Sequence, residues 1–207
     1  MPEPLSDVFN VLLVGVGGQG IVLASDILAE AAMHAGLDAK KSEIHGMSQR
    51  GGPVFSHVRF GARVHSPVIP LGEAQVLYSL ERMELLRWAD HAAPDATAVY
   101  ATTDMLPSGV SAYPDDLDAR IADTFPHVVR FDNREMRGKL SPKVRNVALL
   151  GAASVLMPLP PDCFDLPLET LTPPGTADVN RAGFALGRQI ALAQLAAMGA
   201  LSAATGA

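Results

Sequence analysis

The sequence predicts an α/β domain of three layers, built around a largely parallel sheet that also contains an antiparallel part. Three observations predict this class. Short runs rich in Val, Leu and Ile alternate along the chain with longer segments whose apolar residues recur at helical spacing. A glycine-rich turn separates the first run from the first helical segment. One later run alternates apolar and polar residues, which is typical of a strand in an antiparallel pair.

The first half of the chain contains the clearest patterns. The predicted elements are a strand at 8–14, a helix at 21–35, a strand at 38–45 and a strand at 54–60. Gly36 is a suitable residue to end the helix, because glycine readily adopts the left-handed conformation found there. The pair Gly61-Ala62 predicts a hairpin turn from the strand at 54–60 into a strand at 63–66.

The second half continues the alternation. The predicted elements are strands at 75–80, 97–102 and 127–131, and helices at 81–93, 114–125, 144–156 and 177–198. Six prolines lie in 158–176, so we expect that segment to be irregular. The helix at 177–198 is apolar nearly all round, which favours burial against a partner or against its own core. We expect a single domain over 1–207, with a core at about 8–198 and a frayed tail at 199–207.

Composition excludes several classes of protein. Hydrophobic residues make up 48% of the 207 residues, which is enough for a sizeable core. A net charge of −6 argues against nucleic-acid binding, and no apolar run is long enough to span a membrane, so we expect a cytoplasmic protein. Because Cys163 is the single cysteine, the chain alone cannot form a disulfide, a cysteine-ligated zinc site or a Cys₄ iron–sulfur cluster.

Basic residues are concentrated in parts of the chain. Residues 130–145 contain six Lys or Arg against two acidic residues, and 40–63 contain five against one. Such runs are usually solvated faces, but they also suit a surface that meets an anion or an acidic patch on a partner.

The glycine-rich turn is the first candidate site. Its residues are Gly15, Gly17, Gly18, Gln19 and Gly20, which fit the G-x-G-x-x-G pattern between a strand and a helix. This context is typical of Rossmann-like folds, in which backbone N–H groups at the helix start bind a phosphate or carboxylate. Glu43 lies at about the distance expected of a ribose-binding acid. The same glycines also suit close packing or docking with no nucleotide.

A second candidate segment follows the strand at 38–45. Its candidate residues are His45, Ser48, Gln49, Arg50, Gly51 and Gly52. This concentration of polar groups between glycines favours contact with a ligand or a facing subunit. The Arg50 guanidinium is the best candidate for bidentate recognition of an anion. Arg59 shares a strand face with His57 and could extend this polar surface.

No self-sufficient catalytic group is visible in the sequence. It contains no zinc-protease, serine-hydrolase or P-loop motif, and no nucleophile and base at a spacing that would pair them. We therefore assign no catalytic residue and no metal ligand to this chain alone.

Three segments together resemble a known family. Residues 15–21, 42–52 and 56–61 are similar to the gamma-type domain of 2-oxoacid:ferredoxin oxidoreductases, and most similar to the beta subunit of the indolepyruvate type. The run Glu-Ile-His-Gly-Met-Ser-Gln-Arg-Gly-Gly at 43–52 is the specific part of the match. Residues 66–74 and 146–151 continue it, so the likeness covers most of 8–190.

The resemblance implies a subunit of an enzyme that converts an aryl 2-oxoacid and coenzyme A to an aryl-acetyl-CoA, CO₂ and reduced ferredoxin. It implies that thiamine diphosphate, Mg and the [4Fe–4S] clusters belong to a large alpha subunit. The segment from His45 would face that partner near the active site. Two alternatives remain open, a stand-alone nicotinamide- or flavin-binding oxidoreductase and a docking subunit without a role in catalysis.

Overall fold

The computed structural model describes residues 7–45, 52–106, 109–132, 138 and 140–199. The strands are β1 (Phe9–Val16), β2 (Asp38–His45), β3 (Pro53–Gly61), β4 (Ala74–Ser79), β5 (Ala92–Ala101) and β6 (His127–Phe131). The α-helices are α1 (Ile21–His34), α2 (Arg82–Arg87), α3 (Leu117–Thr124), α4 (Arg145–Ser154), α5 (Asp165–Leu171) and α6 (Ala177–Ala197). Three short 3₁₀ helices are η1 (Ala89–His91), η2 (Pro142–Val144) and η3 (Pro161–Phe164).

The six strands form one mixed sheet in the order β2-β3-β1-β4-β5-β6. Strands β1, β4, β5 and β6 are parallel to one another, whereas β3 is antiparallel to both β1 and β2. The carboxyl ends of β1, β4, β5 and β6 therefore meet at one edge, which we call the C-terminal edge. The predicted α/β class with a largely parallel, mixed sheet is confirmed.

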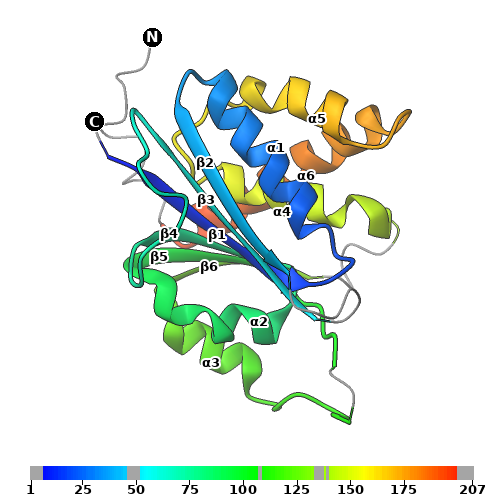
Figure 1. Ribbon diagram of the computed structural model, residues 1–207. Coiled ribbons are helices and arrows are strands. Elements are labelled where there is room, and N and C mark those ends of the chain that lie inside the picture. Colours follow the sequence, from blue (N-terminus) through cyan, green and yellow to red (C-terminus); the bar gives the residue numbers. More distant parts are fainter. Residues whose placement is uncertain (1–6, 46–51, 107–108, 133–137, 139, 200–207) are drawn as a thin grey trace.

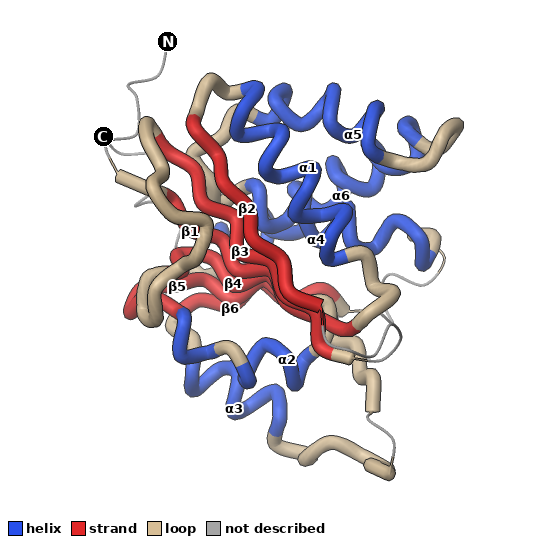
Figure 2. Tube along the Cα trace, viewed as in Figure 1, coloured by secondary structure: helices blue, strands red, loops and turns tan. Residues whose placement is uncertain are grey.

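Helices cover both faces of the sheet. Helices α1, α4, α5 and α6 lie on one face, and α2 and α3 lie on the other (Figures 1 and 2). The chain leaves β1 toward α1 and leaves β4 toward α2, so neighbouring parallel strands send their helices to opposite faces. In open α/β sheets such a switch point leaves a crevice at the C-terminal edge, where ligands usually bind.

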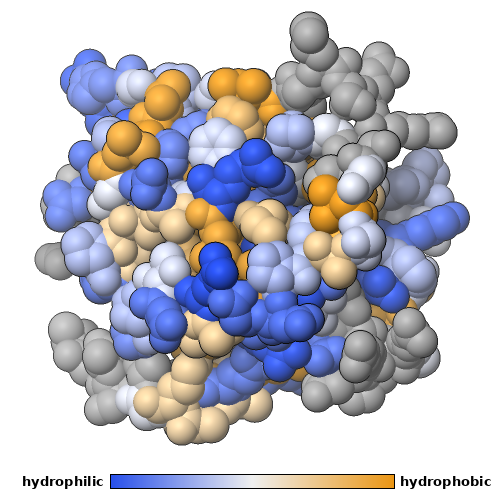
Figure 3. Space-filling view, turned by 90° about the horizontal axis from the view of Figure 1, so that it is seen from below, coloured by the Kyte–Doolittle hydropathy of each residue, from blue (hydrophilic) through white to orange (hydrophobic). Residues whose placement is uncertain are grey.

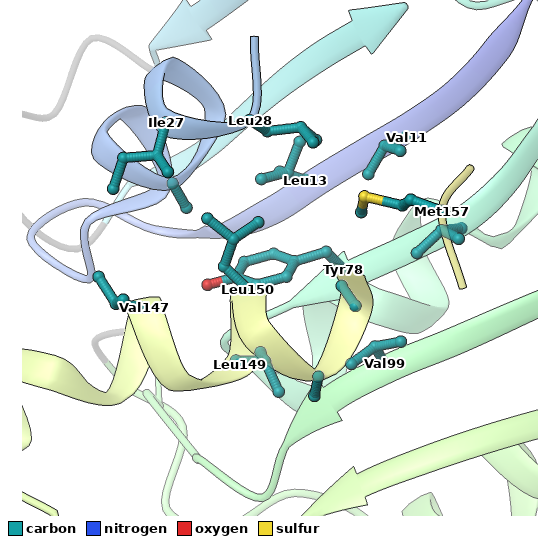
Figure 4. Close-up of a cluster of buried hydrophobic side chains, with 14 of the residues drawn as sticks. Val11, Leu13, Ile27, Leu28, Tyr78, Val99, Val147, Leu149, Leu150 and Met157 are labelled. Atoms are coloured by element: carbon teal, nitrogen blue, oxygen red, sulfur yellow. The ribbon is translucent and has the colours of Figure 1, made fainter. Parts of the chain in front are cut away.

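The larger core lies between the sheet and the α1 side. Figure 4 shows Leu13 of β1, Leu28 of α1 and Leu150 of α4 meeting around the ring of Tyr78, and all four residues are fully buried. Each fully buried Leu contributes about 1.5–3 kcal/mol through the hydrophobic effect. The fixed positions of α1 and α4 on the sheet follow from this packing.

The surface on the α2 and α3 side mixes polar and apolar residues (Figure 3). Viewed from the α2 and α3 side, strongly hydrophobic residues form separate spots among hydrophilic ones (Figure 3). The apolar side chains of this layer instead point inward, where Leu85 of α2 and Ile121 of α3 pack on Leu12 and Leu77 of the sheet.

The predicted hairpin from 54–60 into 63–66 is wrong. Strand β3 pairs with β2 over eight positions, from Asp38 opposite Gly61 to His45 opposite Val54. A strand at 63–66 could offer only half as many pairs, so the longer ladder is favoured. Residues 62–73 instead form an irregular connection that returns the chain to β4.

Two other predictions need correction. The helix expected at 81–93 ends at Arg87, and the chain enters β5 at Ala92, because Pro94 favours an extended conformation in the residue before it. The proline-rich segment at 158–176 contains η3 and α5. Its prolines are compatible with helix because Pro161 and Pro167 occupy first turns, where no backbone N–H is required.

Candidate functional site

The glycine turn, Gly15–Gly20, lies at the C-terminal edge between β1 and α1. Gly18 and Gly20 have φ values of 95° and 86°, a left-handed conformation that L side chains adopt only with strain. The N–H of Gly17 donates to the carbonyl of Gly52 at 2.9 Å. This bond joins the turn to the start of β3.

The side chain of Gln19 has a structural role. Its Oε1 accepts the N–H of Val16 at 2.7 Å, and its Nε2 donates to the carbonyl of Leu80 at 3.0 Å. Gln19 thereby bridges the ends of β1 and β4 at the switch point. A Cβ at Gly15 would lie 2.7 Å from Gln19 Oε1, so Gly15 leaves the room that this bridge needs.

The starts of α1 and α4 meet beside the turn. Asn146 Nδ2 donates to the carbonyl of Gly20 at 3.3 Å, and the Asn146 carbonyl accepts the hydroxyl of Tyr78 at 2.8 Å. Burial raises the pKa of Tyr78 well above its usual range, so this hydroxyl remains a donor. Two helix N-termini, each with a partial positive charge, are thus held side by side.

A pocket of about 250 Å³ opens at this place. Strand ends, the glycine turn and the start of α4 all contribute to it. Its lining residues are Gly18, Gln19, Leu80, Ala101, Thr103, Met105, Pro142, Arg145 and Asn146. We call it the edge pocket. It occupies the crevice that the sheet topology predicts.

Arg145 provides the charge of the edge pocket. Its Nε is buried, and none of the described residues offers that atom a hydrogen-bond partner. No ion pair of Arg145 is found in the part of the chain that the structure describes either. A guanidinium without a counter-charge, beside two helix N-termini, suits a phosphate or carboxylate.

The residues that follow β4 hold another part of the pocket wall in place. Glu81 is fully buried and burial raises its pKa, while its carboxylate accepts the N–H of Glu84 at 2.7 Å. The neighbouring Arg82 holds Asp104 through two bonds of 2.7 and 2.6 Å. The bonds between Arg82 and Asp104 anchor the segment that carries Thr103 and Met105 into the pocket.

The second candidate segment is only partly described. Ser48, Gln49, Arg50 and Gly51 lie outside the described residues, and His45 is the last residue of β2. The carbonyl of Gly52 binds Gly17, so this end of the segment does reach the glycine turn. The placement of the Arg50 guanidinium stays a prediction.

Arg59 and Glu43 are not brought to the edge pocket. Arg59 pairs across from Asn10 near the start of β1, at the edge of the sheet opposite the glycine turn. Glu43 Oε2 forms an ion pair of 2.7 Å with Lys41, which also binds Asp26 of α1. A carboxylate engaged in this way is not arranged as the ribose-binding acid of a nucleotide site.

Sequence reasoning missed Arg145 and Asn146 as site residues. The signal for Arg145 was the excess of basic residues at 130–145, and the charge count could not say which of them faces a pocket. The signal for Asn146 was its place at the start of the 146–151 segment of the family resemblance, but its role depends on contact with Gly20, far away in the sequence.

The described residues form neither a metal site nor a membrane span. Within these residues no group of three or more His, Cys, Asp or Glu is placed to hold a metal ion. No helix among them is both long and apolar enough to cross a membrane.

The fold and the edge pocket define an open α/β protein with a pocket at its switch point, and comparison with known proteins gives the family. Residues 10–190 match the family "Pyruvate ferredoxin/flavodoxin oxidoreductase". The chain belongs to this family.

Two curated relatives share a name. The "Indolepyruvate oxidoreductase subunit IorB" of Thermococcus kodakarensis is 34% identical over 190 residues, covering 86% of this chain and 94% of the relative. The protein of that name from Archaeoglobus fulgidus is 39% identical over 149 residues, covering 69% and 74%.

Solved structures have the same fold. The gamma subunit of a keto/oxoacid ferredoxin oxidoreductase from Geobacter sulfurreducens has a TM-score of 0.69 at 21% identity, covering 91% of this chain and 98% of that one. The 2-oxoglutarate:ferredoxin oxidoreductase of Magnetococcus marinus, solved with 2-oxoglutarate, coenzyme A and succinyl-CoA bound, also has a TM-score of 0.69, at 19% identity. The match covers 91% of this chain and 32% of that longer chain.

Proposed function

We propose that this chain is the subunit without redox cofactors in a 2-oxoacid:ferredoxin oxidoreductase that acts on an aryl 2-oxoacid, such as indolepyruvate or phenylpyruvate. The complex converts the oxoacid and coenzyme A to an aryl-acetyl-CoA and CO₂, and it reduces ferredoxin. Family membership supports the reaction class, and the curated relatives' shared name supports the aryl substrate.

The cofactors belong to a large partner subunit in this proposal. When bound there, thiamine diphosphate with Mg supplies the carbanion chemistry, and [4Fe–4S] clusters carry the electrons. One cysteine in this chain cannot ligate a Cys₄ cluster, which supports that division. This chain's own residues bind and orient a substrate at the interface, with the segment at 45–52 facing the partner.

The observation that carries the proposal is the edge pocket with Arg145, whose buried Nε has no partner among the described residues. A guanidinium whose Nε is already buried beside a helix start is well placed to bind an anion. We assign the pocket to a phosphate group of coenzyme A, because phosphate matches both the guanidinium and the backbone N–H groups of a helix start.

The test uses the complex reconstituted with its partner subunit. Arg145→Met should raise the KM for coenzyme A about tenfold, the effect of losing one charge-assisted contact, while kcat changes little. Lys143→Met is the matched control. Lys143 carries the same charge two residues before Arg145, but its side chain does not line the pocket. Steady-state kinetics with coenzyme A and with pantetheine, which has no phosphate, measure the effect.

Each outcome has a distinct meaning. A KM change for coenzyme A that is absent for pantetheine supports the phosphate assignment. A change confined to the oxoacid would assign Arg145 to the substrate carboxylate instead. Unchanged kinetics in an intact complex would leave this subunit with a docking role. Retention of a nicotinamide or flavin nucleotide by the purified chain would favour a stand-alone oxidoreductase.

A further inference from the structure

A second cavity lies in the helix layer, away from the edge pocket. It has a volume of about 440 Å³, and residues of η3, α5 and α6 line it. We call it the α5–α6 groove. It shares no lining residue with the edge pocket, and its volume is within the usual range of small-molecule sites.

The groove depends on an unusually close approach of α4 and α6. A Cβ at Gly187 would lie 1.8 Å from the carbonyl oxygen of Ala148, and a Cβ at Gly151 would lie 2.1 Å from that of Phe184. Only glycine fits at both positions, so the two helices touch through their backbones. This contact places Arg188 of α6 beside Ser154 of α4.

Arg188 is held in place but has no counter-charge. Its Nη1 donates to Ser154 Oγ at 2.7 Å, and that hydroxyl donates to the carbonyl of Gly151 at 2.7 Å. Burial lowers the pKa of Arg188, and no carboxylate among the described residues lies within ion-pair distance of it. The remaining N–H groups of this half-buried, positioned guanidinium are therefore available to an anionic partner.

Arg181 lines the same groove and is already satisfied. It forms ion pairs of 2.7 Å with Glu169 and 3.2 Å with Asp178. The groove thus offers one free guanidinium, which makes Arg181 a matched control for Arg188.

The rest of the groove supplies two further kinds of contact. Leu168 and Phe184 are buried and give it an apolar floor. Asp162 and Asp165 line it with exposed carboxylates, and neither forms an ion pair with any residue that the structure describes. An unpaired cation and unpaired anions thus line one cavity without contacting each other.

We propose that the α5–α6 groove binds an α-amino acid with an apolar side chain. The carboxylate of the amino acid binds Arg188, its ammonium group lies against Asp162 and Asp165, and its side chain rests on Leu168 and Phe184. This molecule carries both charges a short distance apart on an apolar body, so it satisfies every group that the cavity leaves unpaired.

The test compares three ligands of one size on the purified full chain. L-Phenylalanine has both charges, 3-phenylpropionate lacks the ammonium group, and phenethylamine lacks the carboxylate. Isothermal titration should give saturable binding of L-phenylalanine with a Kd of about 1 mM or tighter, and each analogue should bind about tenfold more weakly.

Variants test the assigned contacts. Arg188→Met should weaken L-phenylalanine binding about tenfold or more, Arg188→Lys should weaken it less, and Arg181→Met should leave it within about twofold. The double change Asp162→Asn and Asp165→Asn should weaken L-phenylalanine binding about tenfold and leave 3-phenylpropionate unaffected. Circular dichroism of each variant checks that the fold is retained.

Three results would overturn the proposal. These are no saturable binding of L-phenylalanine up to about 10 mM, equal binding of 3-phenylpropionate, and an unchanged Kd for L-phenylalanine in a folded Arg188→Met chain.

Discussion

The two edges of the sheet use arginine in opposite ways. At the C-terminal edge, Arg145 has a buried Nε for which the described residues provide no partner. At the opposite edge, Arg59 is saturated: its Nε donates to Asn10 at 2.8 Å, and its Nη1 donates to the carbonyls of Ser66 and Val68 at 3.2 and 2.9 Å. The Arg145 guanidinium thus has a donor left for a ligand, whereas the Arg59 guanidinium binds Asn10 and the backbone at Ser66 and Val68.

The difference follows from what each edge must do. Arg59, together with His57, fixes the 62–73 connection, which has no regular secondary structure of its own. Such a segment must satisfy its backbone groups through side chains or water. At the C-terminal edge, Gln19 and Asn146 fix the glycine turn and the starts of α1 and α4 through amide contacts, which do not engage Arg145. Charge alone therefore does not distinguish the two arginines, whereas their partners among the described residues do.

The largest effect on stability is expected at the saturated edge. Arg59→Met leaves Asn10 and two backbone carbonyls without their donor, so the free energy of unfolding should fall by about 2–4 kcal/mol. Urea unfolding of the full chain measures this loss. Arg63→Met, an exposed position on the same connection, should stay within about 0.5 kcal/mol. If Arg59→Met is equally harmless, Arg59 is not a structural clamp.

A pH dependence should come from the same edge. His57 is buried, its Nδ1 accepts the N–H of Ile69 at 3.2 Å, and burial, with His91 and Arg59 nearby, lowers the pKa of His57 to about 4. The unfolded chain takes up this proton below about pH 6.5 and the folded chain only near pH 4. Stability should therefore fall as the pH drops through that window, by about 2 kcal/mol at pH 5 relative to pH 7.5.

Variants separate this effect from general acid sensitivity. His57→Gln should remove most of the loss between pH 7.5 and 5, whereas His65→Gln, at an exposed position on the same connection, should retain it. Urea unfolding at both pH values gives the comparison. A loss of the same size in His57→Gln would assign the pH dependence to other groups.

The sequence predicted features that depend on local chemistry. The run at 8–14 and the glycines after it carry their own signals, because β-branched residues favour strands and Gly18 and Gly20 permit left-handed turns. Features that depend on distant partners were not predictable in this way. Which strand pairs with β3 is decided by the length of its ladder with β2, and the hairpin expected at Gly61-Ala62 therefore failed.

In the candidate site too, the locally encoded feature was predicted and the features that depend on distant residues were not. The glycine turn was predicted, but the role of Gln19 was not, because its partner Leu80 lies 61 residues away. Arg59 carried the same charge as Arg145 in the sequence, and only the folded arrangement shows that one is engaged by Asn10 and the other faces a pocket.

The smallest expected effect compares the two ends of α1. Gly20 and Gly36 both have left-handed backbones, with φ of 86° and 80°. A Cβ at Gly36 meets nothing within 4 Å, whereas a Cβ at Gly20 would lie 2.5 Å from Asn146 Nδ2. Gly36→Ala should therefore cost about 1 kcal/mol of backbone strain, and Gly20→Ala about 1 kcal/mol more, since Asn146 must move.

The KM for coenzyme A should differ between these two variants more clearly than their free energies of unfolding do. Displacing Asn146 disturbs the contact between the starts of α1 and α4, and with it the position of Arg145 in the edge pocket. Gly20→Ala should therefore raise the KM for coenzyme A in the reconstituted complex, and Gly36→Ala should leave it unchanged. Equal unfolding free energies and equal KM values would show that the meeting of the two helix starts serves neither packing nor binding. A stability difference without a KM difference would limit Asn146 to packing and leave the anion site to Arg145 alone.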